Sequence, residues 1–510
     1  MFPLSQSRPR KLLLRKESSR AVKGRGSPAL DWSIGKAKLG RWSHDFLTFL
    51  KGSSIESNEN AFDDMKQLIS DDENDKTNSL PWASFNFINS IIGSGVIGIP
   101  YALQEAGFGL GLVLLFLVAY ITDYSLILMV RSGHICGKFS YQGIMEAAFG
   151  RPGYILLGIL QFVYPFIAMV SYNVVVGDTV TKVIVRLSGV EHDSVFAKRE
   201  IIVLIATFLI TIPLCLYRDV AKLAKISFIS LVCIGFILIT IFIRIGTMRI
   251  IVPSHDNAWK FANTDIIPAI GIMAFAFMCH HNTFLIYTSI QDASQKRWDV
   301  VTHASIITSL LVACLFGIAG YATFTAYSQG DLLENYCWDD DLMNVSRLLF
   351  SITILLTYPI ECFVTREVIQ NSLFSAPVSE RTHYLITLCI VGSAYLISIS
   401  TDCLGVVLEL NGVLAAVPLA YVLPALSYLQ LEEGFILSRR KIPALAVVIF
   451  GLTVAILGAL FLFADFSEIG SLSHFIERGP GIFGNVAILP LSSIFTQKGK
   501  GKNHYFRTRK

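Results

Sequence analysis

The chain has 510 residues, of which 53% are hydrophobic and 16% are charged, with a net charge of +4 and a mean hydropathy of +0.57. Because a soluble globular protein usually carries about 25% charged residues, this composition excludes a soluble protein and indicates a polytopic helical membrane protein. The net charge says little about partners, because charge in such a protein mainly follows topology, and we expect no nucleic-acid partner. The nine cysteines show no CxxC or CxxH spacing, so we expect neither a zinc site nor a redox pair.

The first 79 residues are polar and divide into two halves of opposite charge. Residues 1–51 contain twelve Lys and Arg residues against three acidic residues, whereas residues 52–75 contain eight acidic residues and one lysine. We expect 1–79 to be a disordered cytoplasmic tail, either simply solvated or contacting anionic lipid through its basic half. An acidic dileucine pattern at 64–69 adds an endolysosomal membrane to the plasma membrane as a predicted location. The tail at 466–510 is expected to be poorly ordered.

Eleven apolar blocks lie between the tails, and each is about as long as a membrane-spanning helix must be. The blocks are 83–102, 109–130, 154–181, 201–217, 226–247, 265–290, 302–324, 345–369, 384–400, 404–429 and 442–463. If the N-terminus lies inside, the cytoplasmic loops hold 13 Lys and Arg residues and the opposite loops hold 7. This bias predicts a cytoplasmic N-terminus, and it places the acidic loop at 325–344 outside.

The first block combines an apolar sequence with polar and flexible residues at its centre. It carries Asn86, Asn89 and the triplet Gly93-Ser94-Gly95, which a helix that only crosses lipid would not need. An interrupted helix is tolerated in a membrane where it is buried in protein or lines a wet cavity. Such interruptions near the midplane are typical of secondary transporters. The alternative interpretation is close helix packing through small residues four apart, namely Ser90, Ser94 and Gly98.

A second interruption is predicted five spans later, in the block 265–290. Here His280, His281 and Asn282 follow Cys279 within an otherwise apolar segment. An ionisable residue at this depth indicates a functional site, and a histidine there could couple transport to pH. The alternative is a histidine that hydrogen-bonds a neighbouring helix. Adjacent helical residues point about 100° apart, so we predict no metal site at this pair.

Several motifs in chain order carry a resemblance to a known family. Residues 85–108, Phe275-Ala-Phe-Met-Cys279-His280 and Leu356-Thr-Tyr-Pro359 resemble spans 1, 6 and 8 of the amino acid/auxin permease superfamily. Within that superfamily, they are most similar to the sodium-coupled neutral amino acid transporters. The stretch from Ser140-Tyr141 through Gly153 resembles the family's cytoplasmic helix after span 2. The resemblance covers residues 80–465, nearly all of the apolar region.

The resemblance implies a leucine-transporter-like fold over 80–465, built from two inverted five-helix repeats plus an eleventh transmembrane helix. It also implies symport of small neutral amino acids with sodium, and protons are a second possible coupling ion. The family's sodium ligands correspond here to Asn89 in span 1 and Thr357 in span 8. Ser351 and Thr353 are alternates for the span 8 ligand. No other cofactor and no enzymatic activity are expected.

The chemistry of an amino acid substrate fits the two interrupted spans. A break at Gly93-Ser94-Gly95 leaves backbone N–H groups at a helix N-terminus, which attracts a carboxylate. Carbonyl groups freed near Ile92 and along Phe275 to Cys279 can accept hydrogen bonds from the substrate's ammonium group. The predicted substrate-binding residues are therefore Ile92, Gly93, Ser94, Gly95, Phe275, Cys279 and His280.

Two further functions remain open at this point. One is a proton-coupled amino acid transporter of the same fold, in which His280 carries the proton. The other is a sensor that binds an amino acid without transporting it and signals through residues 1–75. Sodium dependence of uptake distinguishes the first from symport with sodium, and binding without uptake would identify the second.

Overall fold

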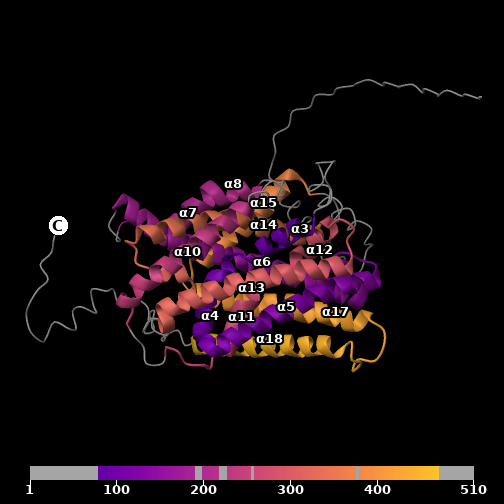
Figure 1. Cartoon of the computed structure of the whole chain (residues 1–510). Coiled ribbons are helices and arrows are strands. Elements are labelled where there is room, and N and C mark those ends of the chain that lie inside the picture. Colours follow the sequence, from indigo (N-terminus) through magenta and orange to yellow (C-terminus); the bar gives the residue numbers. More distant parts are fainter. Residues whose placement is uncertain are drawn as a thin grey trace, which may run out of the picture. The chain divides into compact units, whose positions relative to one another are not determined.

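The computed structural model describes residues 79–189, 194, 198–216, 227–253, 258–374, 378–401 and 403–469. The predicted N-terminal tail lies outside these residues except for Ser79, and only 466–469 of the predicted C-terminal tail is described. The elements of the described residues are all helices, and the long helices run side by side (Figure 1). This is the class of fold expected from the eleven apolar blocks.

The helices follow the predicted blocks in order. Span 2 is α5 (Phe108–Cys136), span 3 lies in α6 (Tyr141–Ser188), and span 5 is α10 (Ser227–Ile251). Spans 7, 8, 9 and 11 are α13 (Gln295–Phe324), α14 (Asp341–Leu373), α15 (Glu380–Ser398) and α18 (Ile442–Ile469). Span 4 consists of α7 (Arg199–Ala206), η3 (Thr207–Thr211) and α8 (Ile212–Leu216). Span 10 consists of α16 (Leu404–Asn411), η7 (Gly412–Ala416), η8 (Pro418–Val422) and α17 (Leu423–Leu431).

The helix lengths agree with a multi-pass membrane protein. Nine helical segments of the described chain are long and apolar enough to cross a membrane, and the bent pair that forms span 1 makes ten. The remaining block is α15, which has 19 residues and begins with a polar turn at Glu380. Farther along α15, the polar Thr387 is satisfied inside the protein, because the Arg366 guanidinium of α14 donates a hydrogen bond to its hydroxyl over 3.0 Å. The predicted eleven blocks therefore all correspond to helices.

Helix α6 joins two segments that the sequence separates. It is 48 residues long, but Gly150 has φ 62° and ψ −152°, which is not helical. Only glycine adopts such a conformation readily, so this residue sets the kink between the short helix 141–149 and span 3. Ser140 caps the short helix by accepting a hydrogen bond from the Gly143 N–H over 3.0 Å.

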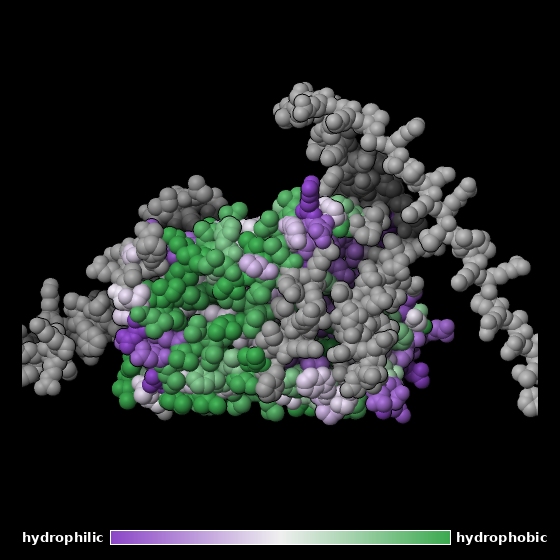
Figure 2. Space-filling view, turned by 90° about the horizontal axis from the view of Figure 1, so that it is seen from above, coloured by the Kyte–Doolittle hydropathy of each residue, from purple (hydrophilic) through white to green (hydrophobic). Residues whose placement is uncertain are grey.

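The outward-facing surface of the bundle is apolar. Phe208 and Leu209 of span 4 are 62% and 71% exposed, and Leu385 of α15 is 62% exposed. On the face shown in Figure 2, apolar residues form a broad band, and hydrophilic residues gather towards its edges. A soluble protein rarely leaves so large an apolar surface open, whereas a bilayer covers it.

Helix packing brings five spans together to form the site. Helix α14 packs along α6, and α13 packs against α5 and against the first half of span 1, α3 (Leu80–Ile91). The first half of span 6, α11 (Ile266–Ala276), contacts both span 1 and span 10. Spans 1, 3, 6, 8 and 10 thus supply the residues of the site described next.

Candidate functional site

Span 1 is interrupted where the glycine triplet predicts it. Helix α3 ends at Ile91, and η1 (Ser94–Gly98) and α4 (Ile99–Ala106) continue in a direction bent by 51°. The two residues between have non-helical backbones, with φ −78° and ψ 87° at Ile92, and φ −126° and ψ −150° at Gly93. The predicted interruption of span 1 is confirmed.

Span 6 is interrupted at the corresponding place. Helix α11 ends at Ala276, and after three residues the chain forms η4 (His280–Asn282) and α12 (Thr283–Ser289). Cys279, just before η4, has φ −142° and ψ 5°. The predicted fold class is therefore confirmed, with the first span of each five-helix half broken as a leucine-transporter-like arrangement requires.

The two interruptions lie directly against each other. A Cβ atom at Gly95 would lie 2.6 Å from the Cα atom of Ala276, so only glycine allows this approach. The Asn282 Nδ2 atom also donates a hydrogen bond to the Ser90 Oγ atom over 2.7 Å. Gly93 differs, because a Cβ atom there would meet nothing within 4 Å. Gly95 thus serves the packing of spans 1 and 6, whereas Gly93 borders open space.

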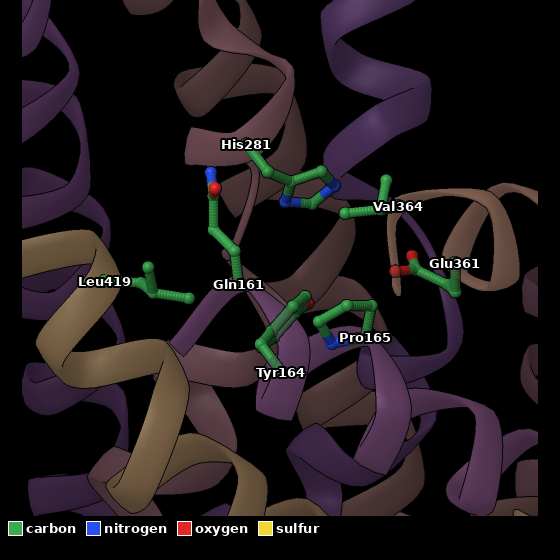
Figure 3. A pocket seen from close by; sticks show the side chains of 7 residues that line it. All are labelled: Gln161, Tyr164, Pro165, His281, Glu361, Val364 and Leu419. Atoms are coloured by element: carbon green, nitrogen blue, oxygen red, sulfur yellow. The ribbon is translucent and has the colours of Figure 1, made fainter. Parts of the chain in front are cut away.

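A small cavity lies beside the break of span 6 (Figure 3). Its volume is about 10 Å³, which is about the space that one water molecule needs. Spans 3, 6, 8 and 10 supply the residues that line it, which are Gln161, Tyr164, Pro165, His281, Glu361, Val364 and Leu419. In Figure 3 the Glu361 carboxyl group points into the space below the His281 ring.

The predicted substrate-binding residues surround this region without lining the cavity. His280 is fully buried, and neither of its ring nitrogens has a hydrogen-bond partner. The Phe275 ring lies 5.8 Å from the ring of Tyr164, which does line the cavity. The fully buried Cys279 and the residues Ile92 to Gly95 belong to the breaks themselves. Glu361 is not among the site residues predicted from the sequence, although an acidic residue within an apolar block is a signal for a site.

The predicted sodium ligands differ in how their oxygens are engaged. The Oδ1 atom of Asn89 is buried without a hydrogen-bond partner. The Thr357 hydroxyl donates to the Thr353 carbonyl over 2.9 Å, which leaves its lone pairs available. The alternate Ser351 is bonded to the Thr179 hydroxyl of α6 over 2.6 Å, and it also donates to the Arg347 carbonyl. Asn89 and Thr357 are therefore better suited to ligate an ion than Ser351.

The acidic loop between α13 and α14, residues 325–340, is fixed to the bundle by ion pairs. Lys182 lies 2.7 Å from Glu334, and Arg244 lies 2.6 Å from Asp340. The buried Arg347 guanidinium donates to loop carbonyls at distances of 2.6–3.2 Å, namely those of Leu333, Tyr336 and Cys337. The loop reaches span 1, because the Gly330 carbonyl lies 3.6 Å from where a Cβ atom at Gly98 would be. The acidic loop therefore lies against the second half of span 1.

Asp331 gives the acidic loop a predicted pH dependence. Burial raises the pKa of its carboxyl group from 3.8 to about 7, the Glu334 carboxylate also raises it, and the Leu333 N–H, Lys182 and Arg347 oppose the shift. A carboxyl group whose pKa is higher in the folded state favours folding when protonated. Its contribution is complete below about pH 4 and is lost as the pH rises through 7, by up to about 1.4 kcal/mol per pH unit.

We expect the unfolding temperature of the purified protein to fall between about pH 5 and about pH 8, and Asp331→Asn to flatten this dependence. The variant keeps a side-chain oxygen that can accept the Leu333 N–H, as Asp331 does over 2.8 Å. Scanning fluorimetry across this pH range measures the effect. An unchanged slope in the variant would show that other groups carry the dependence.

Comparison with known proteins agrees with these features. A family model described as "Transmembrane amino acid transporter protein" matches residues 76–464. "Putative sodium-coupled neutral amino acid transporter 11" of Danio rerio is 47% identical over 387 residues, which are 76% of this chain and 86% of the relative. The Rattus norvegicus protein of that name is 48% identical over 395 residues, which are 78% of this chain and 87% of the rat protein.

More distant relatives include "Vacuolar amino acid transporter 2" of Saccharomyces cerevisiae. It is 30% identical over 401 residues, which are 76% of this chain and 84% of the yeast protein. Among solved structures, a manganese transporter of Eremococcus coleocola is 15% identical, and the alignment covers 82% of this chain and 90% of the manganese transporter. Its TM-score of 0.48 is too low to support an argument about function.

Proposed function

Because the chain belongs to the transmembrane amino acid transporter family, we propose that it is a secondary active transporter that moves small neutral amino acids together with sodium by alternating access. The observation that carries this proposal is the contact between two interrupted spans, with open space beside Gly93. Its relatives are named as transporters, so the chain is not an enzyme.

The substrate's charged groups would be recognised at the two breaks. The first N–H groups of η1, at Ser94 and Gly95, stand at the start of a helical segment that continues to Ala106, so they attract a carboxylate. The absence of a side chain at Gly93 leaves room for the substrate to approach the backbone. Carbonyl groups around Ile92 and Phe275 to Cys279 would accept hydrogen bonds from the ammonium group.

Sodium would bind between span 1 and span 8. The unpartnered Oδ1 atom of Asn89 and the hydroxyl oxygen of Thr357 are hard oxygen ligands of the type that such cations prefer. An ion held by both spans favours the arrangement in which they are close. That arrangement also fixes the geometry of the break in span 1, where the substrate is proposed to bind. Sodium and substrate would therefore each raise the affinity for the other.

A proton-coupled transporter of the same fold is the second candidate, and it is favoured by the buried, unpartnered ring nitrogens of His280. The membrane is proposed to be the plasma membrane or an endolysosomal membrane, with the N-terminus in the cytoplasm. The N-terminal tail that a sensor would use lies outside the described residues.

Uptake measurements test the proposal directly. Radiolabelled neutral amino acids are supplied to cells with the protein at the surface, or to proteoliposomes, in sodium and in choline medium at two pH values. We expect uptake of at least one small neutral amino acid to require sodium. Uptake that is indifferent to sodium but steep in pH would favour proton coupling. Absence of all uptake by a correctly inserted protein would contradict transport.

A further inference from the structure

Glu361 is a buried acidic residue that the proposed sodium symport does not use. It lies in the middle of α14, is 7% exposed, and its Oε2 atom has no hydrogen-bond partner. It forms no ion pair with any described residue. The carboxyl group therefore faces the cavity beside the break of span 6, and no basic residue in the described part of the chain is paired with it.

A carboxylate in such a place needs a cation. Transferring an unpaired charge into a low-dielectric interior is so costly that the group is neutralised or paired instead. Acidic residues inside membrane spans accordingly mark ion and proton pathways. Glu361 thus requires either a proton or another cation whenever the cavity is closed as it is here.

The residues around Glu361 connect it to the break of span 1. His281 lines the same cavity, and its Nε2 atom lies 3.0 Å from the Asn282 Nδ2 atom. Because the amide is a donor, Nε2 accepts, and the neutral imidazole carries its proton on Nδ1, which has no partner. The same Asn282 amide donates to Ser90 of span 1. A chain of three side chains thus runs from the cavity to span 1.

The other titratable groups near Glu361 are limited. Tyr164 and Tyr172 of α6 lie within electrostatic range of its carboxyl group. On its own helix, the guanidinium of Arg366 donates to the Cys215 carbonyl and to the Thr387 hydroxyl, over 2.8 and 3.0 Å. Arg366 is therefore committed to spans 4 and 9. Of the side chains that line the cavity, His281 and Gln161 carry N–H groups that can donate to an ionised carboxylate, and the His281 imidazole is the titratable one of the two.

We propose that Glu361 binds and releases a proton during the transport cycle, with His281 as its partner across the cavity. The lining of the cavity favours a proton over a metal ion, because Pro165, Val364 and Leu419 are apolar and Glu361 is the one carboxyl group among the lining residues, whereas a hard cation takes several oxygen ligands. In the closed arrangement the carboxyl group is protonated and neutral. When the site opens to water, the proton leaves to solvent, and the His281 Nδ1–H can donate to the carboxylate.

This inference rests on the proposed transport function and adds a proton to it. Asn282 hydrogen-bonds both His281 and Ser90. A change in the protonation of Glu361, the partner of His281, would therefore alter the hydrogen bonds that reach the break of span 1. Proton binding at span 8 and substrate binding at spans 1 and 6 would then be coupled, each changing the affinity for the other.

The test uses the full-length protein in proteoliposomes at saturating sodium, with uptake measured between about pH 5.5 and about pH 8.5. A pH-sensitive dye inside the vesicles reports proton movement. We expect the uptake of wild type to change several-fold over this range and to be accompanied by proton flux. Glu361→Gln should keep sodium-dependent uptake but lose both the pH dependence and the flux.

Three further variants keep the test decisive. Glu361→Asp retains an acid and should keep a pH profile with a displaced midpoint. His281→Gln should also displace the midpoint of the pH profile. It replaces Glu361→Gln as the test variant if Glu361→Gln does not fold. Glu380→Gln removes an exposed acid at the start of α15 that does not line the cavity, and its profile should match wild type.

The failure of this inference can be told apart from failure of transport. Robust wild-type uptake with an unchanged pH profile in Glu361→Gln would overturn the role of Glu361 and leave the proposed function intact. No uptake by wild-type protein under any condition would contradict the proposed function itself and this inference with it.

Discussion

Replacing Asn89 by alanine is expected to abolish sodium-driven uptake without preventing the protein from reaching its membrane. The Asn89 Oδ1 atom is buried at the end of α3 without a hydrogen-bond partner, so its removal leaves no other protein group unpaired. A residue that only supports a metal ligand typically contributes on the order of 10- to 100-fold to metal affinity, so loss of a direct ligand is expected to weaken sodium binding by at least that factor. Uptake against sodium concentration, with surface protein quantified, measures the change.

Spans 8 and 7 each supply one threonine of a matched pair for the same experiment. Thr357 and Thr308 both donate their hydroxyl hydrogen to the carbonyl one helical turn earlier, over 2.9 and 2.8 Å. Thr308 is exposed on α13. Thr357→Ala should therefore raise the sodium concentration needed for half-maximal uptake, whereas Thr308→Ala should not. Equal sodium dependence in wild type, Asn89→Ala and Thr357→Ala would place the ion elsewhere.

The interruptions of spans 1 and 6 could be predicted because their signals are local. Gly93 and Gly95 in span 1, and the polar run from His280 to Asn282 in span 6, are incompatible with a helix surrounded by lipid. The alternative interpretation by close packing also describes part of the structure. A Cβ atom at Gly98 would lie 2.8 Å from the Leu408 side chain of span 10, so this residue is needed for packing.

The cavity could not be predicted, because its residues come from four spans that are distant in sequence. Glu361 is adjacent to the resembling motif of span 8, but nothing local shows that it faces His281. Sequence alone also could not decide between His280 and His281. Once the backbone leaves the helical conformation at Cys279, the directions of the following side chains depend on tertiary packing.

Gly95→Ala is expected to impair folding, whereas Gly93→Ala is expected to impair substrate binding alone. At Gly95 the new methyl group would lie 2.6 Å from the Ala276 Cα atom and 2.9 Å from its Cβ atom, so the backbone of one span must move. Overpacking of this kind costs about 1–3 kcal/mol and would separate the two breaks. We expect a lower unfolding temperature and a loss of most uptake.

At Gly93 the methyl group meets nothing within 4 Å, so we expect an unfolding temperature close to that of wild type. The group would instead occupy the open space where a substrate is proposed to approach the backbone. The expected result is a higher KM for the amino acid, and a larger increase for a bulkier substrate than for glycine. Uptake kinetics and scanning fluorimetry on the same preparations separate the two effects.

The comparison distinguishes the two reasons for which a membrane helix keeps glycine. If Gly93→Ala transports every substrate with the KM of wild type, the space beside it is not the substrate site, although the break would still be structural. If the KM rises while stability is unchanged, the absence of a side chain at Gly93 serves the ligand. Gly95, two residues away, would then serve only the contact with Ala276, and one interrupted span would combine both uses.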